Sequence, residues 1–343
     1  MIKAVDTHQD LLRISIASAG NDCRLGGHEA PPAIVSIFLG DELTGILTAL
    51  EAENPYDRQE KREMNIGVNF MPRFPRDTTD RNRTSPFAFT GNKFEFRMPG
   101  SSFSVAGPNV VINTIVADVL MEFANELENA RNFTGALNTL IRDTIREHKR
   151  IIFNGNNYSG EWEIEAAKRG LINWPSSAEA LCHYADPKNI ALFERHKVFT
   201  GTEIRSRQEI LLENYVKIVK IEALTMTDMV NRDILPAILN YSAKLAGDAH
   251  IKAQIGVDDA LDKALCGTLS RMAANVRDRA KGLSDALSGA NESAPVCDQA
   301  RYFREAVVSA IANLRSAVDE AEPMVPAKLW PYPNYGNLLF SVS

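Results

Sequence analysis

Charged side chains alternate along one short segment of the sequence, residues 82–97, which reads NRTSPFAFTGNKFEFR. Lys93, Glu95 and Arg97 occupy every second position, so an extended strand would place all three on the same face. Guanidinium groups bind carboxylates and phosphates through two parallel hydrogen bonds, and a carboxylate can bind a metal ion. The spacing therefore indicates a face that can hold an anionic ligand. A hairpin with one solvent-exposed face is the alternative, because charged residues are mostly exposed.

The same segment predicts a β-hairpin. Gly91 and Asn92 form its two-residue turn, with glycine at the first central position. Folding there pairs Phe89 with Phe94 and Phe87 with Phe96. We expect these four rings to share one face of the hairpin and the charged side chains to occupy the other. Across from the charged side chains stand only small residues, namely Thr90, Ala88 and Pro86.

A second polar block, AGNDCRLGGHEAPP at residues 19–32, carries Arg24 and Glu29 on a segment rich in glycine and proline. We expect a loop there. An ion pair between Arg24 and Glu29 across a surface loop is the alternative interpretation. His28 is adjacent to Glu29, but a lone loop histidine is more often merely solvated.

Bulk properties fit an ordinary globular protein of about two domains, with 343 residues, 45% hydrophobic and 24% charged. The net charge of −6 argues against a nucleic-acid partner. No apolar run is long enough to cross a bilayer. The four cysteines lack CxxC spacing, and we expect free thiols in a reducing cytoplasm.

Hydrophobic periodicity predicts mostly helices around these blocks. A short buried strand is expected at residues 34–38. Helices are expected at residues 3–18, 41–52, from Gly107-Pro108 onward, 133–151, 161–169, from Asp186-Pro187 onward, 202–245 with a kink or break near Pro236, 257–287 and 297–322.

Together the two blocks resemble glutamine synthetase. The resemblance rests on four motifs in order, which are Arg24-Leu25, Glu29-Ala30-Pro31, Asn82-Arg83-Thr84 and Glu95-Phe96-Arg97. The helical continuation at residues 211–238 is similar to the type III branch of that family.

The resemblance implies ATP-dependent ligation of ammonia to L-glutamate through an acyl phosphate. It assigns Arg24 to the glutamate carboxylate and Arg97 to glutamate and the transferring phosphoryl group. Arg83 would face the nucleotide phosphates, together with Lys93. Glu95 would be a ligand of Mg²⁺ or Mn²⁺. Glu29 would lie on the flap that closes over the acyl phosphate and would take a proton from ammonium.

The implied fold class is α+β: the second half of a glutamine synthetase catalytic domain with a split β-barrel, followed by a mainly helical region. We expect catalytic-domain residues at 1–155, with an insertion at about 40–80, a helical type III domain at 156–325 and an extended tail at 326–343. The family forms double rings, so the complete protein is expected to be a homo-oligomer.

The family's other metal ligands, its nucleotide-binding loop and its N-terminal β-grasp domain precede the part of the family that this sequence matches. We therefore expect residues 1–343 alone to lack ligase activity, since one carboxylate cannot supply an octahedral oxygen shell. Two alternatives are a γ-glutamyl–amine ligase of the same fold and a non-catalytic scaffold or regulatory subunit.

Overall fold

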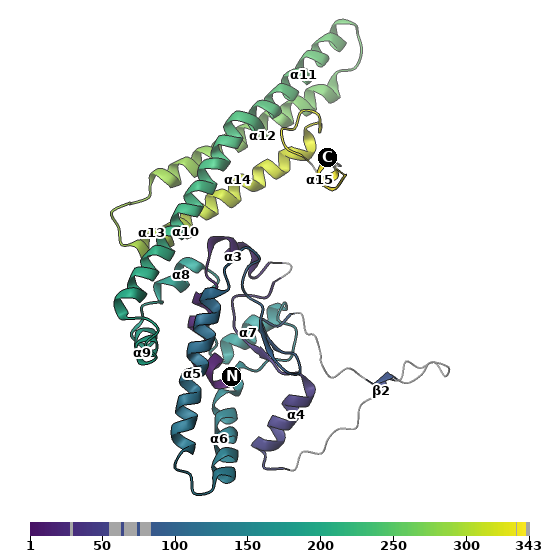
Figure 1. Ribbon diagram of the computed structural model, residues 1–343. Helices are drawn as coiled ribbons and strands as arrows, with labels where there is room; N and C mark the ends of the chain where they lie inside the picture. Colours follow the sequence, from purple (N-terminus) through teal and green to yellow (C-terminus); the bar gives the residue numbers. More distant parts are fainter. Residues whose placement is uncertain (28–29, 55–62, 65–73, 76–83, 334, 341–343) are drawn as a thin grey trace. The chain divides into compact units, whose positions relative to one another are not determined.

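The computed structural model of the protein describes residues 1–27, 30–54, 63–64, 74–75, 84–333 and 335–340. They form two compact units, Met1–Leu211 and Leu212–Ser343. Helices dominate both units, and a small sheet lies in the first (Figure 1). The expectation of a helix-rich α+β protein is therefore confirmed.

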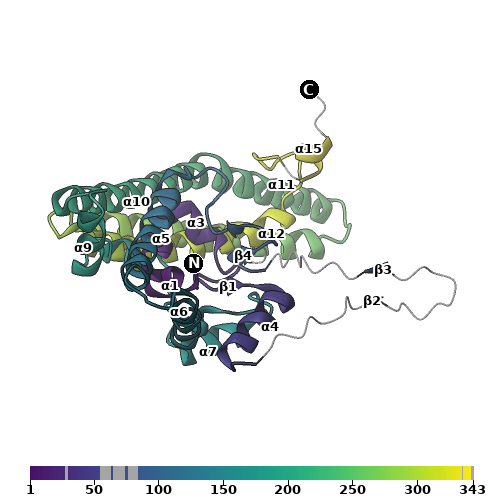
Figure 2. The same ribbon diagram turned by 60° about the horizontal axis from the view of Figure 1, so that its bottom comes forward.

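Two short helices begin the first unit, α1 (Ile2–Thr7) and α2 (Gln9–Ser15). Helix α1 packs against the long helices α5 (Ala106–Leu127) and α6 (Phe133–His148), as Figure 2 shows, and α2 packs against α5. Burial of apolar side chains drives this packing. The core residues of these elements are Val5, Leu11, Leu12, Ile14, Ile16, Val111, Ile115, Val119, Leu140 and Ile145.

The sheet has three strands in the order β1-β4-β5. They are β1 (Ile37–Phe38), β4 (Phe87–Phe89) and β5 (Phe94–Phe96). Strand β1 runs parallel to β4, and β4 and β5 form an antiparallel hairpin. The central strand β4 is therefore paired on both sides.

The hairpin has the predicted register. Phe87 lies opposite Phe96 and Phe89 opposite Phe94. The ring centroids of Phe87 lie 5.8 Å from Phe94 and 5.5 Å from Phe96, so the rings share one face. Gly91 has a φ of 93°, a conformation that side chains with a Cβ rarely adopt, which explains glycine at this turn position.

Helix α4 (Gly40–Glu51) follows β1 and lies within the predicted insertion. Two short strands lie further along the insertion, β2 (Glu63–Met64) and β3 (Phe74–Pro75), and pair antiparallel, side by side in Figure 2. Most other residues of the insertion lie outside the described part of the chain.

The rest of the first unit is helical. It contains a 3₁₀ turn at Lys149–Ile151, α7 (Gly160–Lys168), α8 (Ser177–Cys182) and α9 (Pro187–Arg195). Gly170 has a φ of 69° just after α7, as predicted for a helix C-terminus.

The second unit is built from long helices. Helix α10 (Gly201–Met229) passes through a π-helical segment at Val230–Ile234 into α11 (Leu235–Gln254). The irregular segment ends at Ile234, two residues before Pro236, whose missing N–H removes a helical hydrogen bond. The regular α-helix is therefore interrupted near Pro236, where a kink or break was expected, but the chain stays helical through this point. Helix α12 (Ala260–Ser288) packs along α11 and α14 (Figure 1). The remaining elements are α13 (Val296–Tyr302), a π segment at Phe303–Val307, α14 (Val308–Ala321) and a 3₁₀ turn at Glu322–Met324.

Three expectations need correction. The segment that carries Arg24 is helix α3 (Ala19–Arg24) rather than loop. The tail expected to be extended includes helix α15 (Tyr335–Phe340). Cys23 and Cys266 form no disulfide, as expected, whereas the expectation is wrong for Cys182 and Cys297, which are disulfide-bonded.

Among the described residues, no helix has the length and apolar character needed to span a membrane.

Candidate functional site

The charged face of β5 carries a connected set of polar side chains. Nε and Nη2 of Arg97 donate to Oε2 of Glu95 at 3.2 and 2.8 Å. Oγ1 of Thr90 donates to Oε1 of Glu95 at 3.3 Å, and Nζ of Lys93 lies 3.7 Å from the same atom. The structure thus brings Lys93, Glu95 and Arg97 together, as predicted from their alternation.

The environment of Glu95 favours its ionised form. Its pKa is lowered, chiefly because Arg97 donates hydrogen bonds to the carboxylate, with smaller contributions from Thr90 and Lys93. Glu95 is therefore an anion at neutral pH and keeps part of its surface in solvent.

Arg24 lies at the end of helix α3 and reaches the chain just beyond β5. Its Nε donates to Oδ1 of Asn21 at 2.9 Å, and its Nη2 donates to the carbonyl oxygen of Met98. Met98 directly follows Arg97 in the sequence. Two basic residues that are 73 positions apart in the sequence numbering are thereby brought to the same end of the hairpin.

Arg24 keeps its positive charge uncompensated among the described residues. Both of its hydrogen-bond acceptors are neutral, one an amide oxygen and the other a backbone carbonyl. Burial lowers its pKa, and the nearby Tyr158 opposes this effect. An arginine nevertheless stays protonated at neutral pH. Because its two acceptors are neutral, the positive charge of Arg24 is available to an anionic ligand.

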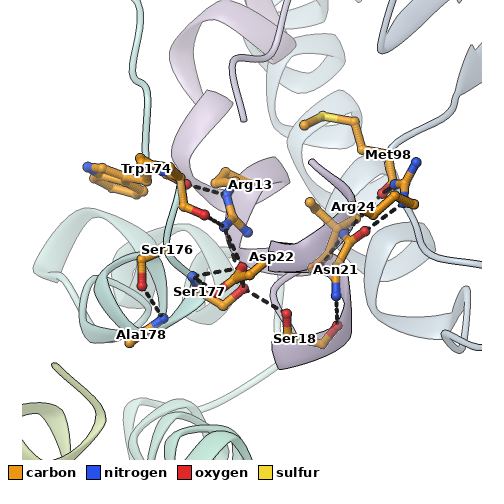
Figure 3. Close-up of polar contacts among 12 residues, drawn as sticks. Arg13, Ser18, Asn21, Asp22, Arg24, Met98, Trp174, Ser176, Ser177 and Ala178 are labelled. Atoms are coloured by element: carbon orange, nitrogen blue, oxygen red, sulfur yellow. Dashed lines mark hydrogen bonds and ion pairs between the residues drawn. The ribbon is translucent and has the colours of Figure 1, made fainter. Parts of the chain in front are cut away.

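A buried ion pair anchors helix α3 (Figure 3). Nη2 of Arg13 lies 3.3 Å from Oδ1 of Asp22, and both side chains are at most 4% exposed. The backbone N–H of Ser177 donates to both carboxylate oxygens of Asp22, at 3.0 and 2.8 Å, and its hydroxyl donates to Oδ1. Arg13 also donates to the carbonyl oxygen of Trp174 at 2.7 Å.

Local sequence explains the start of α3. Ser18 has an extended backbone and its hydroxyl accepts a hydrogen bond from the N–H of Asn21, which is the N-cap arrangement. The helix ends at Arg24, and Gly26 follows with a φ of 76°. The N–H of Gly26 donates to the carbonyl oxygen of Pro31 at 3.0 Å and closes the base of the segment between them.

Two predicted site residues, Glu29 and Arg83, lie outside the described residues, as does His28. The residue after Arg83 is described: Oγ1 of Thr84 accepts a hydrogen bond from the N–H of Asn157 at 3.2 Å. Asn157 is fully buried and also donates to Oγ of Ser36 at 2.8 Å.

The donor set fits a metal ion only in part. Glu95 is an ionised carboxylate, which suits Mg²⁺ or Mn²⁺. Among the described ranges, however, no group of three or more His, Cys, Asp or Glu side chains could enclose a metal ion. The described residues therefore supply one ligand rather than a coordination shell.

A cavity of about 700 Å³ lies away from Arg24 and β5. It lies along α4 and α6, and its lining includes Arg146, Lys149, Arg150 and Arg169. Three of these cations are held by carboxylates: Lys149 by Glu51, Arg150 by Asp6 and Arg169 by Glu165, at 2.6 to 2.8 Å. Their charges are compensated, so we place the candidate site at Arg24 and β5.

Sequence patterns alone missed Arg13, Asn21, Asp22 and Ser177. The serine N-cap signal at Ser18 was available and would have predicted α3, but the glycine and proline content of the block favoured a loop. The contacts of Arg13 with Trp174 and Ser177 join residues far apart in the sequence, so no pattern of neighbouring residues predicts them.

Residues 136–253 match the family "Glutamine synthetase C-terminal domain". The chain is 39% identical to a glutamine synthetase of Butyrivibrio fibrisolvens over 100% of its own length and 49% of that protein. It is 39% identical to the type-3 glutamine synthetase of Dictyostelium discoideum, covering 99% of this chain and 48% of the relative.

The chain is similar to glutamine synthetases along essentially its whole length. A glutamine synthetase of Bacteroides fragilis is 34% identical over 99% of the chain and 49% of its own length. The resemblance inferred from the four motifs, including the type III branch, is thereby confirmed. The chain spans about half the length of the curated relatives that it matches.

The substitution Asp22→Asn should destabilise the first unit strongly. It leaves the guanidinium of Arg13 buried and unpaired, which typically costs about 3–5 kcal/mol. Urea unfolding of the chain measures the loss. In the control, Glu213→Gln removes the partner of Lys217 in an exposed pair and should cost under about 1 kcal/mol. Equal costs for both variants would contradict the anchoring role.

The pKa of the Glu95 carboxyl should rise in Arg97→Gln, because the largest cause of its lowering is removed. Thr90→Val should raise it less. A pKa that is lowered in the folded state stabilises the protein above the unfolded-state pKa, and this contribution is lost as the pH falls through the folded-state pKa. An NMR titration of the Glu95 carboxyl measures its pKa in the wild type, in Thr90→Val and in Arg97→Gln, and the values should increase in that order. An unchanged Glu95 pKa in Arg97→Gln would refute the assignment.

Proposed function

We propose that this protein serves the ATP-dependent ligation of ammonia to L-glutamate through γ-glutamyl phosphate. The observation that carries the proposal is the placement of Arg24. Among the described residues its guanidinium is held by neutral acceptors, the amide oxygen of Asn21 and the backbone carbonyl of Met98, which directly follows Arg97. An uncompensated cation beside a cation–carboxylate pair suits a substrate that bears carboxylates and receives a phosphoryl group.

In this proposal Arg24 binds the carboxylate of glutamate, and Arg97 contacts glutamate and the phosphoryl group in transfer. Arg97 donates to Glu95 through Nε and Nη2. That pairing orients its guanidinium, which is the preorganisation that electrostatic catalysis needs. Lys93 and Arg83 bind the nucleotide phosphates.

Glu95 contributes one ligand to Mg²⁺ or Mn²⁺, whose chemistry would be to neutralise charge on the phosphates. Glu29 accepts a proton from ammonium on the segment whose base is closed between Gly26 and Pro31. The fold proposal is that residues 1–155 form part of a split-barrel catalytic domain, residues 156–325 a helical type III domain and residues 326–343 a tail. A cytoplasmic homo-oligomer completes this proposal.

Two alternative functions can be tested in the same assay. A γ-glutamyl–amine ligase would use the same cations for the glutamate and a different amine acceptor. A non-catalytic scaffold or regulatory subunit would be favoured by the single metal ligand among the described residues. Faster turnover with a larger amine than with ammonia would indicate the γ-glutamyl–amine ligase. A lack of turnover with every amine would indicate the non-catalytic subunit.

The substitution Arg24→Gln should raise the KM for glutamate or lower the rate by about a hundredfold, because it removes a preorganised cationic contact. The assay follows glutamine formation from glutamate, ammonia and ATP by the protein as cells produce it. Arg315→Gln is the matched control, since Arg315 is exposed on α14 and pairs only with Asp319 among the described residues. Normal kinetics in Arg24→Gln would overturn the assigned role.

Residues 1–343 by themselves should make no glutamine. The reason is that Glu95 is the one expected metal ligand among the described residues, and a single carboxylate cannot complete the octahedral oxygen shell of Mg²⁺. The measurement is glutamine formed by purified residues 1–343, with and without added Mg²⁺ or Mn²⁺. Product above a reaction without enzyme contradicts this prediction and shows that the chain holds the remaining ligands.

A further inference from the structure

Asn21 lies at the junction of helix α3 and the segment after β5. Its side chain is almost completely buried, with the residue only 3% exposed. Its Nδ2 donates to the carbonyl oxygen of Ile16 at 2.8 Å and to that of Met98 at 3.1 Å. Its Oδ1 accepts from Nε of Arg24 at 2.9 Å (Figure 3). Every polar atom of this side chain is therefore engaged.

The orientation of the Asn21 amide follows from its partners. Two of its neighbours are carbonyl oxygens, which can only accept hydrogen bonds, and the third is a guanidinium N–H, which can only donate. A flipped amide would set oxygen against two carbonyls and an NH₂ group against the guanidinium. Only one orientation satisfies all three contacts, so the oxygen is fixed toward Arg24.

The carbonyl of Met98 joins Asn21 and Arg24. It accepts from Nδ2 of Asn21 and from Nη2 of Arg24, which uses both of its lone pairs. Asn21 therefore holds Arg24 directly through Nε and indirectly through the oxygen that receives Nη2. Two contacts fix the plane of a guanidinium group, whereas one would leave it free to rotate.

These contacts also decide which part of Arg24 is left for a ligand. The hydrogen bonds to described residues use the N–H of Nε and one N–H of Nη2, and they leave both N–H groups of Nη1 and the second N–H of Nη2. Because both acceptors are neutral, the two hydrogen bonds orient Arg24 without neutralising its positive charge. A carboxylate of Asp or Glu at position 21 would orient the guanidinium too, but it would compete with an anionic substrate.

We propose that Asn21 is a positioning residue, whose amide oxygen orients the guanidinium of Arg24 to receive the carboxylate of the substrate. The substrate half of this inference rests on the proposed function. Asn21 itself touches no reacting atom and acts through Arg24.

The first experiment tests the positioning without reference to activity. The Nε–H signals of arginine side chains are recorded by NMR on the full chain, and the Arg24 signal is assigned with Arg24→Lys. In Asn21→Ala the Nε–H of Arg24 should exchange with solvent about tenfold faster, because it loses a hydrogen bond that involves a charged group. Unchanged exchange of this proton overturns the proposal.

A matched control excludes a general loss of stability. Asn189 is also fully buried and donates to the carbonyl oxygen of His183 at 3.0 Å, far along the sequence from Arg24. Asn189→Ala should leave the exchange of the Arg24 Nε–H unchanged. Equal acceleration in Asn21→Ala and Asn189→Ala would reduce Asn21 to an ordinary structural residue and overturn the proposal.

The second experiment tests the substrate half in the protein as cells produce it. Asn21→Ala should raise the KM for glutamate about tenfold while kcat changes less, because the loss lies in carboxylate binding. In an Arg24→Gln background the same substitution should have no further effect on KM. Additive effects would overturn the inference. A wild-type protein without glutamate-dependent activity would overturn the proposed function, while the exchange measurement still decides whether Asn21 orients Arg24.

Discussion

The buried pair of Arg13 and Asp22 is the interaction on which the candidate site depends. Burial lowers the pKa of Arg13, and Asp22 opposes that effect. Nη1 of Arg13 is buried without a hydrogen-bond partner among the described residues, so desolvation of the guanidinium is only partly offset. Such a pair specifies geometry more than it adds stability. Because Asp22 lies in the middle of α3, fixing Asp22 fixes the direction in which Arg24 leaves the helix.

Elements specified by neighbours in the sequence could be predicted. The hairpin follows from Gly91 and from alternating phenylalanines, which determine the register without help from distant residues. The π-helical interruption just before Pro236 likewise follows from a missing N–H. The grouping of Lys93, Glu95 and Arg97 on one face is a consequence of the strand period. All of these are properties of fewer than twenty consecutive residues.

The surroundings of Arg24 could not be predicted in the same way. Its acceptor Met98 lies 74 positions away, and the anchor between Arg13 and Ser177 joins residues 164 positions apart. No periodicity reports such contacts. A loop was expected at residues 19–32 because glycine and proline are frequent there. Ser18 instead caps helix α3, and the tertiary contacts of Asp22 stabilise that helix. The family motifs identified Arg24 without revealing what holds it.

The three arginines in this region differ in how their charges are balanced, and this difference separates structure from function. Arg13 pairs with a buried carboxylate and Arg97 with the half-exposed Glu95. Arg24 is held by an amide oxygen and a backbone carbonyl, both neutral. Orienting a guanidinium with a carboxylate would neutralise the charge that an anionic ligand needs, whereas neutral acceptors orient it and preserve that charge. Holding the Arg24 guanidinium in place without neutralising it costs desolvation energy. The buried pair of Arg13 and Asp22 fixes helix α3 and so keeps Arg24 in position.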